Sequence, residues 1–289
     1  LYGGFLALDR ARDAEAEAAY GKALELATEE NRAEIVQRVA SYYYERERYD
    51  DAEKTLKDGI EARKDDLDLI YALARFYHSR GDQAKADSMI EQATSARPNE
   101  AKPFLILSAY RGRNGDLAGA LDAAEKAIEV APEDATAKLR KAELLIDMGV
   151  REASKERLAT GRAIVDAVLA KAADMPEAHF VHAKLDLSEG KADDAVASLR
   201  RALDRRPDWA QAHFLLGSAL LMQNDREQAR AEVLRAIELD ADFVDARRLL
   251  TKVHALLGEH DLAIEESRRV LRQRPDDRER HHCQRGRHF

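Results

Sequence analysis

The chain has 289 residues, of which 45% are apolar, 35% are charged and only 6% are aromatic. With so few aromatic residues, and with only 14 glycines and 6 prolines, it is poor in strand formers and turn residues, which predicts a nearly all-helical protein. The formal net charge of −8 disfavours a nucleic-acid partner, no apolar run reaches the length of a membrane span, and one cysteine, Cys283, allows no internal disulfide.

A period of 34 residues organises the sequence. It is marked by glycines, and Asn224 fills one vacant place in their series because asparagine also tolerates a left-handed turn. Prolines follow the same period, which is interrupted once by seven extra residues. The markers are Gly81, Gly115, Gly149, Gly190 and Gly258, and Pro98, Pro132, Pro207 and Pro275. Repetition of this length is typical of stacked helical repeats.

In this register a partial repeat near 1–32 is followed by seven full ones. The full repeats lie near 33–66, 67–100, 101–134, 135–175, 176–209, 210–243 and 244–277. The extra residues fall within Val150–Ala159, and seven residues make about two helical turns. We therefore expect the second helix of the repeat 135–175 to start early and to project beyond its neighbours.

The best-formed repeat, 210–243, predicts two helices joined by a turn. Its first helix has an apolar face that includes Leu216 and Leu220. Its second helix carries a small–large–small series, Ala229–Val233–Ala236 in outline, that recurs in the other repeats and lets neighbouring helices approach closely.

This pattern resembles the tetratricopeptide repeat family, most clearly in Leu69–Tyr77 (LIYALARFY) and the residues that follow as far as Pro98. The resemblance covers about 1–277 and implies an all-α fold, a single right-handed α-solenoid superhelix of about eight stacked helix–turn–helix repeats. It also implies a non-catalytic scaffold or adaptor whose concave groove binds a peptide or a helix of a partner protein. The alternatives are the recruiting arm of a larger enzyme, such as a glycosyltransferase, and a bacterial envelope or exopolysaccharide-assembly protein, which the Ala- and Arg-rich repeats also resemble.

In this family the first helices line the inner wall, so its residues are read from the second, fifth, ninth and twelfth places of each repeat. The wall is polar and aromatic in the early repeats and becomes an apolar track with basic residues later, which fits a partner segment with acidic flanks. Each of these residues could instead pack against the adjacent repeat. The candidate groove residues are Tyr71, Arg75, His78, Leu105, Phe180, Lys184, Leu187, Phe214, Leu221, Arg248 and Lys252.

One known specificity of the family is not expected here. Repeats that clamp the C-terminal carboxylate of chaperone tails carry asparagine at the ninth place, and this chain has none there. The ninth places hold Ser41, Arg75, Ala109, Glu143, Lys184, Ser218 and Lys252.

The sequence shows no nucleophile, phosphate-binding or dinucleotide motif, so we expect neither an enzyme nor a cofactor. His179, His182 and His213 have a spacing that zinc accepts. They lie at core-facing places, however, and we interpret them as packed, hydrogen-bonded side chains rather than metal ligands.

The tail 278–289 is basic and contains three histidines and Cys283. We expect it to be disordered or otherwise unselected rather than a metal site. Because the chain begins at Leu1 and shows no signal peptide, we read it as a fragment or processed product, which leaves bacterial cytoplasm and periplasm both open. Self-association through uncapped solenoid ends is a further alternative.

Overall fold

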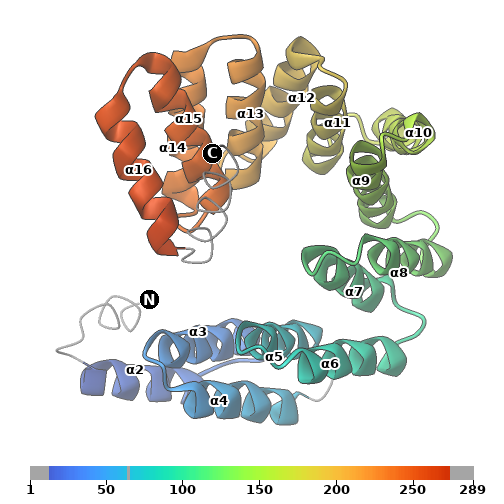
Figure 1. The fold of residues 1–289 in the computed structure, drawn as a ribbon. Helices are drawn as coiled ribbons and strands as arrows, with labels where there is room; N and C mark the ends of the chain where they lie inside the picture. Colours follow the sequence, from blue (N-terminus) through green and yellow to red (C-terminus); the bar gives the residue numbers. More distant parts are fainter. Residues whose placement is uncertain (1–12, 64–65, 274–289) are drawn as a thin grey trace, which may run out of the picture. The chain divides into compact units, whose positions relative to one another are not determined.

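The computed structural model describes residues 13–63 and 66–273, which form fifteen α-helices and no strand (Figure 1). The expected all-α fold is therefore confirmed for this part of the chain. The helices are α2 (Asp13–Glu25), α3 (Arg32–Glu45), α4 (Tyr49–Ala62), α5 (Leu67–Ser79), α6 (Gln83–Ala96), α7 (Ala101–Arg113), α8 (Leu117–Val130), α9 (Ala135–Glu152), α10 (Lys155–Lys171), α11 (Pro176–Ser188), α12 (Ala192–Arg205), α13 (Ala210–Met222), α14 (Arg226–Leu239), α15 (Val244–Leu257) and α16 (His260–Gln273). The basic tail 278–289 and Pro275 lie outside the described residues, as does the start of the repeat 1–32.

From α3 to α8, and again from α9 to α16, the helices come in pairs and each helix packs on the next one along the chain. The chain divides into two compact units, which we call unit 1 (1–132) and unit 2 (133–289). Each is a stack of helix pairs, so the expected α-solenoid architecture is confirmed in both. None of the helices in the described ranges is both long enough and apolar enough to cross a membrane.

The core of each stack is built from the small–large–small series of the second helices. In α12 this series is Ala195, Leu199 and Ala202, and all three side chains are fully buried. Leu199 packs in one cluster with Leu216 and Leu220 of the following first helix. The small residues bring the helix axes close together, and the large one fills the space that remains.

The turns between paired helices show why glycine marks the period. Gly81, Gly115, Gly190 and Gly258 all have positive φ, between 76° and 84°. Asn224 stands at the equivalent place with φ of 62°, as predicted from its position in the series. Helices end here in left-handed residues, which glycine adopts without a steric penalty.

The placement of Gly149 in this series of turn glycines was wrong, because Gly149 is not in a turn. It lies inside α9, where it is buried, and the left-handed place is taken by Ala153 with φ of 53°. A Cβ on Gly149 would lie 2.9 Å from Leu158 Cδ2, so this glycine serves the close approach of two helices instead.

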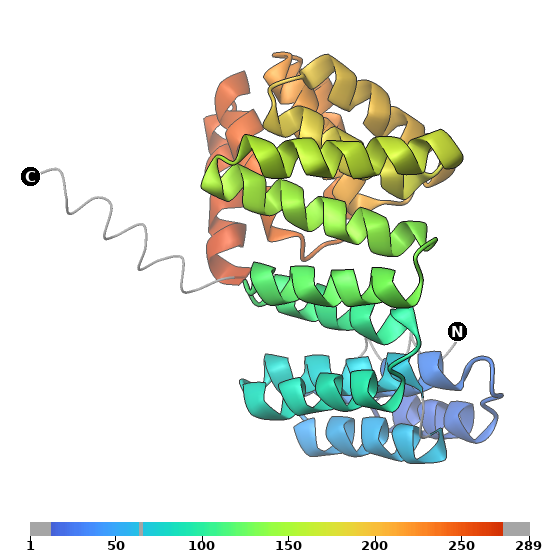
Figure 2. The same cartoon turned by 90° about the vertical axis from the view of Figure 1, so that its right-hand side faces the viewer.

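Gly149 lies inside a helix because of the way the seven extra residues are accommodated. α9 has 18 residues, whereas the first helices of the other described pairs have 13 or 14. α10 has 17 residues, whereas the second helices of the other described pairs have 14. The insertion thus lengthens both helices by about one turn each, and not the second helix alone as the sequence had suggested. Both helices gain a turn that packs against the other, and α9 and α10 lie side by side along their length (Figure 2).

Candidate functional site

One face of the first helices of unit 2 is left open by the second helices. On α13 it contains Phe214, Ser218, Leu221 and Met222, none of which is fully buried. Their spacing of four, three and one residues places them along one side of the helix, opposite the buried Leu216 and Leu220. We call the corresponding surface of α9, α11, α13 and α15 the first-helix face.

A charged cluster occupies the α9–α11 part of this face. Lys184 Nζ lies 3.0 Å from Glu143 Oε1 and 2.9 Å from Asp147 Oδ1, and Arg140 Nη1 lies 2.9 Å from Glu143 Oε2. Burial would raise the pKa of the Glu143 carboxyl, but Lys184 and Arg140 outweigh it and lower that pKa below its usual value. Lys184 is thus neutralised within the chain, and it is not the free cation that its candidate role required.

The two aromatic candidates pack against the aromatic residue that precedes the next first helix. The ring of Phe180 stacks on Trp209 with 4.5 Å between centroids, and Phe214 lies 5.0 Å from Phe243. Arg206 in turn covers the Trp209 ring, with its guanidinium carbon 4.6 Å from the ring centre. Both phenylalanines are half-buried, so they shape the surface and also hold adjacent repeats together.

Two exposed apolar side chains of this face were missed by the sequence reasoning. Met222 is 51% exposed and Leu256 is 41% exposed, while the candidates Leu187 and Leu221 are half-buried. Met222 and Leu256 occupy the thirteenth place of their repeats, which was not counted as inner wall. The thirteenth place is four residues after the ninth and therefore shares its face, as Lys184 shows by reaching both Glu143 and Asp147.

The remaining candidates of unit 2 supply positive charge. Lys252 is exposed on α15, and Arg248 is exposed on the same helix, where its Nη1 lies 3.0 Å from Asp245 Oδ1. Exposed pairs of this kind are weak, so a partner's carboxylate can compete for the arginine.

Four candidates belong to unit 1, three with polar side chains on α5 and Leu105 on α7. Tyr71 accepts a hydrogen bond from Arg113 Nη1 at 3.1 Å, and Arg75 is exposed. His78 Nδ1 lies 2.8 Å from Gln83 Oε1, and its ring meets the Tyr110 ring edge-on at 6.0 Å. Leu105 is half-buried on α7.

The histidines singled out in the sequence each have a protein partner. His179 Nε2 lies 2.8 Å from the carbonyl oxygen of Ala173, and His182 Nδ1 lies 2.8 Å from Asp186 Oδ2. His213 lies between two acceptors, with Nδ1 2.6 Å from Glu232 Oε2 and Nε2 2.9 Å from the Pro207 carbonyl oxygen. Across 13–63 and 66–273, no three His, Cys, Asp or Glu side chains come together as a metal site would require.

The His213 contacts predict a pH dependence of stability. The hydrogen bond with Glu232 raises the pKa of His213, burial opposes it, and the Pro207 carbonyl adds to the increase. Because the folded-state pKa lies above the unfolded one, we expect this stabilisation to be complete below about pH 6.5 and lost as the pH rises through the raised pKa. In urea unfolding across this pH range, the free-energy difference between wild type and His213→Gln should shrink toward alkaline pH. The free-energy difference between wild type and Glu232→Gln should shrink toward alkaline pH in the same way. A difference that stays constant with pH would contradict a stabilising contact between protonated His213 and Glu232.

Comparisons with known proteins agree with this architecture. A family model described as tetratricopeptide repeat matches residues 43–105 and 186–252. No curated protein matches the chain.

Solved structures share the fold at low sequence identity. A tetratricopeptide repeat protein from Parabacteroides merdae ATCC 43184 aligns with a TM-score of 0.62 and 15% identity, covering 86% of this chain and 95% of its own. Yeast Tom70 aligns with a TM-score of 0.63 and 15% identity, covering 94% of this chain and 59% of its own. A thermophilic tetratricopeptide repeat protein of Thermus thermophilus, TTC0263, aligns with a TM-score of 0.54 and 19% identity, covering 62% of this chain and 94% of its own.

Proposed function

We propose that this chain, in which a tetratricopeptide repeat model matches residues 43–105 and 186–252, is a non-catalytic scaffold whose unit 2 binds a segment of a partner protein on the first-helix face. The repeat is an interaction fold, and its open helix face is suited to hold an extended peptide or an amphipathic helix.

The observation that carries the proposal is the exposed apolar surface of α13 and α15. Met222 is 51% and Leu256 is 41% exposed, and Leu221 and Leu187 are half-buried at the twelfth places of their repeats. Contiguous apolar surface costs free energy in water, and on a folded protein it commonly marks an interaction site.

Charge defines the kind of partner segment. The apolar strip is bordered on α15 by Lys252 and Arg248, and on α9 and α11 by the internally neutralised Lys184 cluster. A segment with one or two apolar anchors and an acidic flank would place its carboxylates toward α15. The polar candidates of unit 1, Tyr71, Arg75 and His78, form a second surface that we propose as a separate contact for the same class of ligand.

The test uses peptides selected on the intact chain from a random display library, each then measured by fluorescence polarisation. Because Phe180 and Phe214 hold repeats together, their replacement would confuse binding with folding, so we choose the double variant Met222→Glu with Leu256→Glu. We expect at least a tenfold loss of affinity, since a carboxylate in the strip removes an apolar contact and repels acidic flanks.

The matched control is Leu234→Glu with Leu262→Glu. These leucines are 41% and 45% exposed on the second helices α14 and α16, so the chemical change and the exposure are closely matched. We expect the control to bind within about twofold of wild type. Equal affinity of both double variants for every selected peptide would mean that the first-helix face is not the binding surface.

A further inference from the structure

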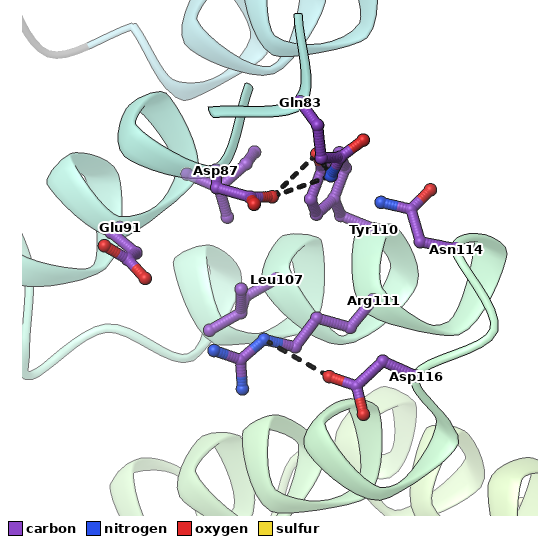
Figure 3. A pocket seen from close by; sticks show the side chains of 9 residues that line it. Gln83, Asp87, Glu91, Leu107, Tyr110, Arg111, Asn114 and Asp116 are labelled. Carbon is purple, nitrogen blue, oxygen red and sulfur yellow. Dashed lines mark hydrogen bonds and ion pairs between the residues drawn. The ribbon is translucent and has the colours of Figure 1, made fainter. Parts of the chain in front are cut away.

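A groove lies on the other side of the first helices in unit 1, between the second helices α6 and α8 with α7 as its floor. It consists of two adjoining hollows, of about 260 Å³ and about 510 Å³, that share Glu91, Leu107 and Arg111. Figure 3 shows the side chains that line the smaller hollow. The floor side chains Phe104, Leu107 and Arg111 stand on one side of α7, at spacings of three and four residues.

The groove is open where α6 carries short polar side chains at places that hold large apolar ones in the equivalent helix α12. In the 34-residue register Asp87 corresponds to Val196 of α12, and Thr94 corresponds to Leu203. In unit 2, Val196 is only 7% exposed and packs with Leu203 in the core. On α6 the same two places carry shorter side chains, and below them Phe104 of α7 is half-buried while Leu107 is 8% exposed.

One end of the groove is held rigid by a hydrogen-bond network. Asp87 Oδ1 accepts hydrogen bonds from Gln83 Nε2 at 2.8 Å and from the Tyr110 hydroxyl at 2.9 Å (Figure 3). Burial, and then the hydrogen bond to Asp87, raise the pKa of Tyr110, so the hydroxyl stays protonated and keeps donating. The position of this carboxylate is therefore fixed before any ligand arrives.

The rim is strongly acidic. Arg111 is partly engaged within the chain, with Nε 4.0 Å from Asp116 Oδ2 and Nη1 donating to the Gly119 carbonyl at 3.3 Å. Lys126 is the other cation that lines the groove. Six carboxylates face these two cations, those of Asp87, Glu91, Asp116, Asp122, Glu125 and Glu129.

We propose that this groove binds a lysine- or arginine-rich segment of a partner protein, with an apolar side chain of that segment over Phe104 and Leu107 and its cations along the acidic rim. The apolar floor supplies the area that favours contact, and the excess of carboxylates selects the charge of the ligand. This ligand is opposite in charge to the one proposed for the first-helix face of unit 2. One chain would then hold two different partner segments.

The experiment measures binding of a fluorescein-labelled probe peptide, in which lysines alternate with leucines, to the intact chain by fluorescence polarisation at low salt. The groove variant is Glu91→Lys with Asp122→Lys, both exposed and on opposite walls. The matched control is Glu61→Lys with Asp204→Lys, also exposed on second helices, which changes the net charge by the same amount.

We expect the groove variant to weaken probe binding at least tenfold and the control to weaken it less than threefold. The milder pair Glu91→Gln with Asp122→Asn keeps the side-chain volumes and should weaken binding in the same direction. Replacing the probe's leucines with serine should weaken it further, since the floor then has no contact. Helical circular dichroism equal to wild type confirms that each variant is folded.

Three results would overturn the proposal: no saturable binding of the probe to the wild type, equal loss in the groove and control variants, or no loss in the groove variant. Equal loss would mean that the probe responds only to overall charge. The Met222→Glu, Leu256→Glu variant should bind this probe at least as well as wild type, so failure of this proposal and failure of the proposed function are distinguishable.

Discussion

Replacing Leu199 with alanine should lower the free energy of unfolding by about 3 kcal/mol, because a fully buried leucine is lost from a close-packed helix junction. Leu199 is on α12 and packs in one cluster with Ala183 of α11 and with Leu216 and Leu220 of α13. The surrounding backbone is held by fully buried alanines and cannot collapse into the space, so most of the cavity should remain.

The matched control for this variant is Leu234→Ala on α14, where the leucine is 41% exposed. We expect it to change stability by less than about 0.5 kcal/mol. Since repeat stacks are not two-state, urea unfolding should be combined with hydrogen exchange, and protection should fall most in α11–α13. A uniform loss of protection through every described helix would contradict the neighbour-by-neighbour model of stability.

Gly217→Val should be destabilising by about 3 kcal/mol, although valine is the better helix former. A Cβ at this position would lie 2.5 Å from Val233 Cγ2 and 3.1 Å from the Ala229 carbonyl oxygen, so the valine must push α13 away from α14. Val233 is fully buried and β-branched, and a valine in a helix strongly prefers one rotamer.

Gly21→Val in α2 is the control for the glycine variant, because nothing lies within 4 Å of the corresponding Cβ. We expect Gly21→Val to be neutral or slightly stabilising, as a valine in a helix interior costs less than a glycine. Thermal unfolding followed by circular dichroism would separate the two, and a Gly217→Val protein as stable as wild type would show that the helix pair is not closely packed there.

The repeat was predictable from the sequence because it rests on local chemistry. Left-handed turns need glycine or asparagine, and close helix contacts need small residues, so both leave a period that survives in one sequence. Gly149 was wrongly predicted to be a turn glycine because glycine also occurs where two helices approach closely. Only the packing of α9 on α10 distinguishes these two roles.

The candidate sites were less predictable, since exposure depends on what a neighbouring repeat contributes. Phe180 was placed on the correct face, yet Trp209, a residue outside any helix, covers part of it. Met222 was overlooked because its place had been left out of the register. The acidic groove depends on the absence of bulk at Asp87 and Thr94, which no motif reports.

The extra turns of α9 and α10 have a consequence for how such a chain can change over evolutionary time. Seven residues return both helices of the hairpin to the same angular phase, so the added segment displaces only the tip and leaves the contacts at the base untouched. Indels of one, two or three residues at this tip would rotate one helix against the other and misalign its core. Length variation among relatives of this repeat should accordingly occur in steps of seven.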